Sequence, residues 1–98
     1  MVKENDAMKS VHLIVSGRVQ GVGFRYFIKQ IAAQHYIKGW IRNRDDGRVE
    51  IAAEGTAQQV DSFIRKIRRG TFLARVEDIE IHMCAPQNYT AFDEKATV

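Results

Sequence analysis

The order in which two kinds of hydrophobic periodicity follow one another constrains the fold of this chain most strongly. Apolar residues at every second position are typical of strands with one buried face, whereas spacings of three and four residues are typical of helices. Strands are predicted near residues 11–16, 39–43, 49–53 and 79–83, and helices at residues 24–36 and 56–70. The predicted order is therefore strand, helix, strand, strand, helix, strand.

Local signals support the boundaries of these elements. Thr56, followed by Gln59 three residues later, forms a capping box, and Gly70 is typical of a helix C-terminus. The pair Asp46-Gly47 predicts a hairpin between the second and third strands. This order is that of the ferredoxin-like plan, an α+β sandwich in which two helices cover one face of an antiparallel sheet.

The plan brings two distant segments to the same end of the sheet. The first strand leads into residues 17–23, and the second strand runs back so that Asn43 finishes at that end. In the usual order for this plan, the third strand lies between the first two. Two inter-strand spacings, roughly 10 Å, then separate the loop from Asn43. We expect one small ligand to contact both.

The length and composition predict one domain over residues 1–98, with a lead-in at 1–9 and a polar, poorly periodic tail at 84–98. Hydrophobic residues make up 45% and charged residues 28%, which is typical of a globular protein rather than a disordered one. No apolar run approaches the ~18 residues of a membrane span, and the N-terminus lacks a signal-peptide core. We therefore expect a cytoplasmic protein without a membrane partner. The pattern leaves open whether the tail forms a final strand.

Positive charge is concentrated in the first half of the chain. The sequence carries 15 Lys and Arg against 12 Asp and Glu, a net charge of +3. Residues 18–48 hold seven of the basic residues and two acidic ones, Asp45 and Asp46. Such a cluster is consistent with a solvated surface, and also with a partner that carries phosphate or carboxylate groups. Charge alone does not choose between these interpretations.

The segment from Gly17 to Arg25, GRVQGVGFR, joins the first strand to the N-terminus of the first helix. Glycines allow consecutive N–H groups to point into one concavity, and a helix N-terminus adds free donors and the positive end of the helix dipole. Arg25 falls in the first helical turn, and its planar guanidinium suits phosphate. The segment is interpreted either as an anion cradle or as a tight turn with a solvated arginine. Its glycines match neither the Walker loop nor the dinucleotide-binding motif.

No other group of residues predicts a catalytic centre. Cys84 lacks the arginine that a phosphatase cysteine needs six residues later, because that position is Thr90. The three histidines are explained better by packing or exposure than by metal ligation, and no Cys/His pair has zinc spacing. Asp45 and Asp46 are explained by the hairpin turn. We therefore expect no metal and no cofactor, and a site that acts by binding and orienting.

Two segments resemble the signatures of one family. Residues 17–25 are similar to the first acylphosphatase signature, and residues 39–49, GWIRNRDDGRV, together with Gly55, are similar to the second. The similarity spans about residues 11–83, in the right order and on the right elements. It implies a small, metal-free, monomeric hydrolase in which Arg25 binds phosphate and Asn43 orients the attacking water. The implied substrate-binding loop consists of Gln20, Gly21, Val22, Gly23, Phe24 and Arg25.

The implied reaction suits a site without acidic or nucleophilic side chains. An acyl phosphate releases a carboxylate with a pKa of only ~4, so its departure needs no general acid. Loop N–H groups and Arg25 would neutralise the phosphoryl oxygens, and Asn43 would hold a water in line. The resemblance suggests that the base is a phosphate oxygen of the substrate. Inorganic phosphate, the product, is then expected to inhibit competitively.

Two interpretations from other classes are weighed against this one. The same plan carries RNA-recognition domains, which stack bases on aromatic residues of the central strands, but the strands VHLIVSG and RVEIAAEG have none. We therefore expect no nucleic-acid partner. The second alternative is a non-catalytic domain that binds a small anion in the same loop. Only the family resemblance at Asn43 argues against it.

Overall fold

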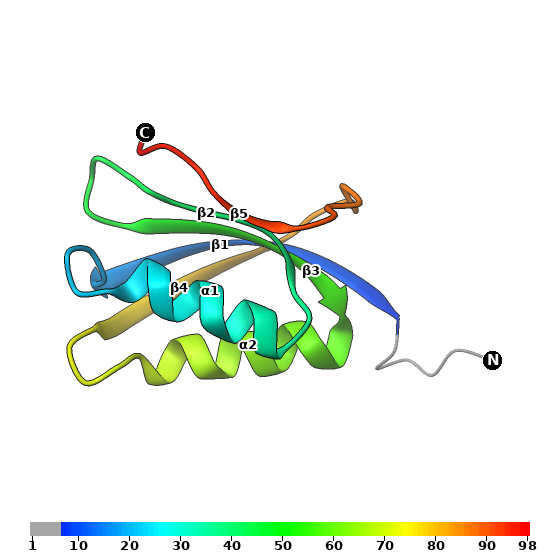
Figure 1. The fold of residues 1–98 in the computed structure, drawn as a ribbon, viewed down its shortest axis with the longest axis horizontal. Helices are drawn as coiled ribbons and strands as arrows, with labels where there is room; N and C mark the ends of the chain where they lie inside the picture. Colours follow the sequence, from blue (N-terminus) through cyan, green and yellow to red (C-terminus); the bar gives the residue numbers. More distant parts are fainter. Residues whose placement is uncertain (1–6) are drawn as a thin grey trace.

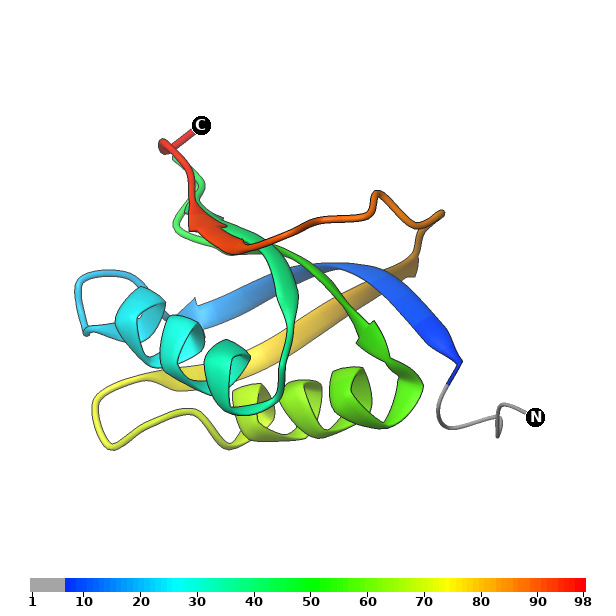
Figure 2. The same ribbon diagram turned by 45° about the vertical axis from the view of Figure 1, so that its right-hand side comes forward.

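The computed structural model describes residues 7–98. Its elements are β1 (Met8–Arg18), α1 (Phe24–Gln34), β2 (Lys38–Asn43), β3 (Val49–Thr56), α2 (Ala57–Arg69), β4 (Arg75–Met83) and β5 (Phe92–Glu94). Both helices lie on the same side of one sheet (Figures 1 and 2). The α+β, ferredoxin-like plan predicted from the sequence is therefore confirmed, with a fifth strand added. None of the helices in the described part is long and apolar enough to cross a membrane.

The sheet has the strand order β4-β1-β3-β2-β5. The pairs formed by β1 with β3, β1 with β4 and β2 with β3 are antiparallel, and β5 runs parallel to β2. As predicted, β3 separates β1 from β2. The C-terminal ends of β1 and β2 consequently lie at the same end of the sheet, two strand spacings apart.

Apolar side chains fill the space between the sheet and the helices. Leu13 of β1 and Ile51 of β3, which are register partners, are fully buried, as are Ile28 of α1 and Phe63 of α2. Alternate residues of a strand face opposite sides, which explains why one face of the sheet packs against both helices. Burying a side chain of this size contributes about 1.5–3 kcal/mol to folding.

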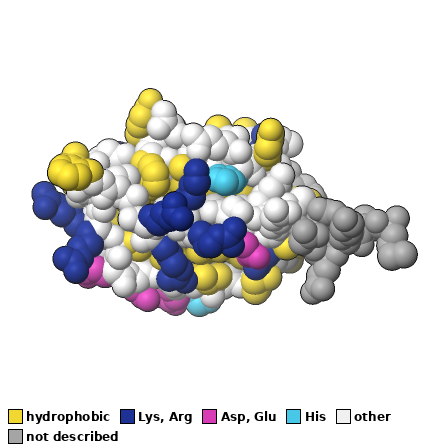
Figure 3. Space-filling model, turned by 90° about the horizontal axis from the view of Figure 1, so that it is seen from below, with side chains coloured by type: hydrophobic (Ala, Val, Ile, Leu, Met, Phe, Trp, Pro, Cys, Tyr) yellow, Lys and Arg dark blue, Asp and Glu magenta, His cyan; other side chains and the backbone are white. Residues whose placement is uncertain are grey.

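Helix α2 begins and ends where the local signals predict. The Thr56 side chain accepts a hydrogen bond from the N–H of Gln59, and the Gln59 side chain accepts one from the N–H of Thr56. Gly70 ends the helix with a positive φ of 65°. Lys66, Arg68 and Arg69 lie in its last turn, where cations stabilise the negative end of the helix dipole. Seen from below, the helical side of the molecule presents a group of Lys and Arg side chains (Figure 3).

Other boundaries differ from the sequence-based prediction. Strand β4 begins at Arg75 rather than near Ile79, because its backbone continues to pair with β1 past a bulge between Ser16 and Gly17. Strand β1 already begins at Met8, so Met8 and Lys9 belong to the sheet rather than to the expected lead-in. The rest of that lead-in, up to residue 6, lies outside the described residues. Helix α1 ends at Gln34, shortly before Tyr36 adopts a φ of 58°.

The tail forms the short strand β5 at the free edge of β2. Gly39 donates its N–H to the carbonyl of Ala91 at 2.9 Å, and Lys95 donates to the carbonyl of Ile41 at 2.8 Å. Phe92 anchors the strand, since its ring packs on that of Phe63 of α2, with 6.3 Å between the two ring centroids. The question that the sequence left open is answered by this strand. It also carries Glu94 to the end of the sheet where β2 finishes.

Candidate active site

A hollow of about 240 Å³ lies at the end of the sheet where β1 and β2 finish. It is lined by side chains and backbone from the glycine loop, the start of α1, the end of β2 and β5. The lining residues are Val19, Gln20, Gly21, Gly23, Phe24, Arg25, Tyr26, Asn43 and Glu94. The structure therefore brings the loop and Asn43 together around one space, as the topology predicts. Of the predicted loop residues, only Val22 is absent from the lining, because its side chain packs against the core.

The loop presents backbone donors that have no acceptor within residues 7–98. Gly21 and Gly23 have φ values of 71° and 74°, and the space around a Cβ at either position is open, so glycine is needed there for conformation rather than for room. Gly23 caps α1 without a side-chain hydrogen bond. Among the described residues, no backbone or side-chain group accepts from the N–H groups of residues 21–25. These donors suit an anion.

Gln20 connects the loop to the β2–β3 hairpin. Its side-chain amide donates to the carbonyls of Arg44 and Arg48, at 2.8 and 2.9 Å. The amide nitrogen of this side chain thus holds the loop and is not available as a donor to a ligand. The sequence did not reveal this contact, because the hairpin carbonyls lie 24 and 28 residues away along the chain.

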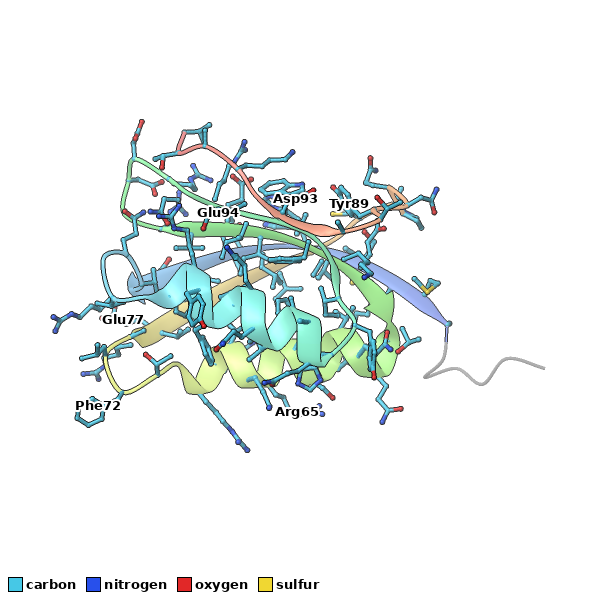
Figure 4. The ribbon with its side chains drawn as sticks, viewed as in Figure 1. Arg65, Phe72, Glu77, Tyr89, Asp93 and Glu94 are labelled. Carbon is cyan, nitrogen blue, oxygen red and sulfur yellow. The ribbon has the colours of Figure 1, made fainter. Side chains whose placement is uncertain are left out.

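Arg25 lies in the first turn of α1, as predicted, and faces a carboxylate that the sequence did not place there. Its Nη1 lies 3.6 Å from Oε1 of Glu94, and the two side chains are 38% and 40% exposed. In Figure 4, Glu94 lies above the start of α1. Only the parallel pairing of β5 with β2 brings Glu94 to this position. The hollow therefore contains one cationic and one anionic side chain, together with the free N–H donors.

Asn43 ends β2 with its side-chain oxygen inside the structure. Its Oδ1 atom is buried, and no group in residues 7–98 donates a hydrogen bond to it. Its backbone carbonyl accepts from the N–H of Val98 at 3.1 Å. A buried acceptor without a partner is costly in a folded protein, so this oxygen is suited to a small donor such as water.

The hairpin that follows Asn43 is held by its own residues as well as by Gln20. Asp46 accepts hydrogen bonds from the backbone and the guanidinium of Arg48, and Gly47 donates its N–H to the carbonyl of Arg44 at 3.1 Å. The side-chain hydrogen bond from Arg48 is the main reason why the pKa of Asp46 is lowered to about 2. In the part of the chain that the structure describes, no hydrogen bond joins the Asn43 side chain to this hairpin, so the side chain does not act as its cap.

The groups that bind metal ions in other hydrolases do not come together here. Within residues 7–98, no group of three or more His, Cys, Asp and Glu side chains is placed so that it could hold a metal ion. His12 contacts Glu50 on the face of the sheet away from the helices, and Cys84 is exposed. The hollow can thus offer an anion one guanidinium and several N–H donors, with the Asn43 oxygen nearby.

Comparison with known proteins decides the family. A family model described as acylphosphatase matches residues 11–94. This chain belongs to the acylphosphatase family. An acylphosphatase from Bacillus licheniformis is 47% identical over 74 residues, which are 76% of this chain and 82% of that protein. One from Oceanobacillus iheyensis is 44% identical over 90 residues, or 90% of this chain and 99% of that one.

Solved structures agree with this assignment. The crystal structure of acylphosphatase from Bacillus subtilis superposes with a TM-score of 0.86 at 39% identity, and the match covers 90% of this chain and 98% of that chain. The family and the enzyme class inferred from the two signatures are confirmed. The chain is an acylphosphatase, a hydrolase of acid anhydrides, rather than a non-catalytic binding module.

Proposed function

We propose that the hollow between the glycine loop and Asn43 hydrolyses the carboxyl–phosphate anhydride of small acyl phosphates to a carboxylate and inorganic phosphate. One observation carries this assignment. A single space joins the free N–H groups and Arg25, which suit a phosphoryl group, to Asn43, whose side-chain oxygen has no hydrogen-bond partner within residues 7–98 and suits a water.

The loop and Arg25 stabilise charge on the phosphoryl group. Donors fixed in advance toward a developing charge lower the barrier, because they need no reorganisation during the reaction. Arg25 supplies a planar fork that can contact two phosphoryl oxygens. The leaving carboxylate has a pKa of ~4, so the absence of an acid in the hollow does not impede its departure.

Asn43 orients the attacking water. Its Oδ1 accepts a hydrogen bond from the water, which directs a lone pair of the water toward the phosphorus held by the loop. Among the lining residues Glu94 is the one carboxylate, and its negative charge faces an anionic substrate, so the substrate itself is the better acceptor for the water's other proton. A nonbridging oxygen of the substrate therefore takes it. This sequence of events requires neither a metal ion nor another cofactor.

Glu94 tunes the affinity of the hollow for anions. At 3.6 Å it competes with a phosphoryl oxygen for Arg25, and its own charge repels phosphate. Because both side chains are more than a third exposed, the ion pair is weak and an incoming dianion displaces it. Glu94 thereby favours release of inorganic phosphate, which is also a competitive inhibitor. The enzyme acts as a cytoplasmic monomer on small molecules, without a nucleic-acid partner.

The test is hydrolysis of acetyl or benzoyl phosphate with and without EDTA. Equal rates are expected, while a simple alkyl phosphate should resist because its alkoxide leaving group needs a proton. Asn43→Ala, purified in parallel, controls for contaminating phosphatases. Loss of activity on chelation, or comparable cleavage of the alkyl phosphate, contradicts the mechanism. Phosphate binding without hydrolysis points instead to a non-catalytic anion site.

A further inference from the structure

The loop between α2 and β4 carries two apolar side chains that are largely exposed. Phe72 is 103% exposed and Leu73 is 60% exposed. Figure 4 shows Phe72 projecting away from the body of the protein, beyond the end of α2. Isolated apolar residues on a surface are ordinary, but two adjacent ones at a projecting tip are unusual.

A hydrogen-bonded turn shapes the tip. The Thr71 hydroxyl accepts hydrogen bonds from the N–H groups of Leu73 and Ala74, at 3.2 and 2.9 Å, and Thr71 donates its own N–H to the carbonyl of Ala74. Ala74 is buried and fixes the far side of the loop to the core. The exposure of Phe72 and Leu73 is therefore imposed by a hydrogen-bonded turn.

Arginines surround this tip. Arg18, Arg68, Arg69 and Arg75 line the same surface depression as Phe72 and Leu73. We call these six residues the arginine-rimmed tip. Within the described part of the chain, none of the four arginines takes part in a salt bridge or a side-chain hydrogen bond, whereas Arg42 and Arg48 elsewhere on the surface are paired with carboxylates. The depression has a single acidic member, Glu77.

We propose that the arginine-rimmed tip docks on an anionic lipid bilayer. A projecting pair of apolar side chains inserts into the boundary between headgroups and acyl chains, and arginines at its base reach the lipid phosphates. The proposal concerns a surface contact and no membrane span. It goes beyond the sequence-based expectation of no membrane partner, which rested on the absence of an apolar run and did not consider a surface contact.

The composition of the tip favours a bilayer over a nucleic acid. Binding of single strands relies on a charged groove with several aromatic side chains on which bases stack. Here the depression has one aromatic residue, and its neighbour Leu73 is aliphatic. Both the apolar pair and the unpaired arginines are instead accounted for by an anionic interface.

Docking would orient the active site. Arg18 ends β1 and directly precedes the loop that lines the hollow, and the α2–β4 loop lies at the same end of the molecule as the glycine loop (Figure 1). The hollow would therefore open close to the lipid surface. The inference does not depend on the roles proposed for Arg25 and Asn43, since neither residue belongs to the tip.

Co-sedimentation with vesicles tests the proposal. The protein should bind vesicles of phosphatidylcholine containing roughly 30% phosphatidylserine, and bind pure phosphatidylcholine much less. Phe72→Ala should weaken binding on the order of tenfold relative to the wild type. The double variant Arg68→Gln/Arg69→Gln should weaken it by ~20-fold. Tyr36→Ala and Arg65→Gln are matched controls, because they remove an exposed aromatic and an arginine away from the tip; both should bind normally. All variants should retain wild-type hydrolysis of acetyl phosphate.

A second measurement separates insertion from simple charge attraction. The fluorescence of Phe72→Trp should shift to the blue on anionic vesicles, while Trp40, under Arg42 and Lys95 on the other face of the sheet, gives a constant background. No binding to anionic vesicles overturns the proposal, as does binding that Phe72→Ala and Arg65→Gln weaken equally. Tighter binding of single-stranded DNA than of vesicles, lost in Phe72→Ala, would assign the tip to nucleic acid instead.

Discussion

Replacing Glu94 by Gln isolates the one anionic group in the hollow. The substitution keeps the size of the side chain and removes its charge, which lies 3.6 Å from Nη1 of Arg25. At about this separation two unit charges interact by ~1 kcal/mol in water. The side chains are 38% and 40% exposed, so the value for exposed pairs, ~0.2–1 kcal/mol, applies. Relief of the repulsion between Glu94 and bound phosphate adds a contribution of similar size.

The variant should therefore bind inorganic phosphate about three- to tenfold more tightly at low salt, because a free-energy difference of about 1.4 kcal/mol corresponds to a tenfold change in affinity. The difference should shrink as salt screens both interactions. Competitive inhibition of benzoyl phosphate hydrolysis measures the affinity, and the rise in melting temperature with added phosphate measures it independently.

Asp93→Asn provides the matched control. Asp93 is the neighbouring residue of β5, it is exposed, and it does not line the hollow. Its removal changes the net charge equally, so any effect common to both variants is a general one. Weaker phosphate inhibition in Glu94→Gln than in the wild type would refute the reasoning. That result would mean that Glu94 holds Arg25 in its binding position and does not compete for it.

Three further changes test the site and its support. Arg25→Lys keeps the charge but loses the planar fork, so it should lose most activity and phosphate affinity; near-normal kinetics would remove the bidentate role. Asn43→Ala should stay folded, bind phosphate, and lose at least ~100-fold in kcat, and normal turnover would end its assignment to the water. Burial raises the pKa of Glu50, but hydrogen bonds from Arg42 and His12 outweigh it and leave the pKa below the ordinary 4.5. A carboxylate with a lowered pKa stabilises the fold above pH 4.5 and loses this contribution as the pH falls. The urea concentration at the unfolding midpoint should therefore decrease when the pH is lowered below 4.5. Glu50→Gln should make this decrease smaller.

The parts of the fold that short-range chemistry determines could be predicted from the sequence. Thr56, Gln59 and Gly70 define α2 through contacts within one turn, and these boundaries are correct. The start of β4 could not be predicted, because polar residues such as Arg75 and Asp78 join the sheet through backbone pairing with β1. Apolar periodicity carries no information about such pairing. Strand β5 could not be predicted for the same reason, because Phe92 is its one residue that packs against the core and no apolar periodicity marks the strand.

The candidate site was predictable to a similar degree. The topology correctly brings the glycine loop and Asn43 to one end of the sheet, since strand direction and order decide that placement. The roles of Gln20 and Glu94 depend on distant segments, namely the hairpin carbonyls and the edge of β2. No local pattern marks a side chain for such contacts. The roles of Arg25 and Asn43 in the reaction stay predictions until the variants are measured.

The position of β3 between β1 and β2 has a consequence for how the enzyme acquires activity. The two halves of the hollow follow strands that do not pair with each other, and no residue of β3 is among the lining residues of the hollow. Until β3 inserts between its neighbours, the loop and Asn43 have no fixed separation. Formation of the site therefore waits for non-local strand pairing, which is slow because long loops must close first. Recovery of hydrolysis during refolding should accordingly lag behind helix formation and report the completed sheet.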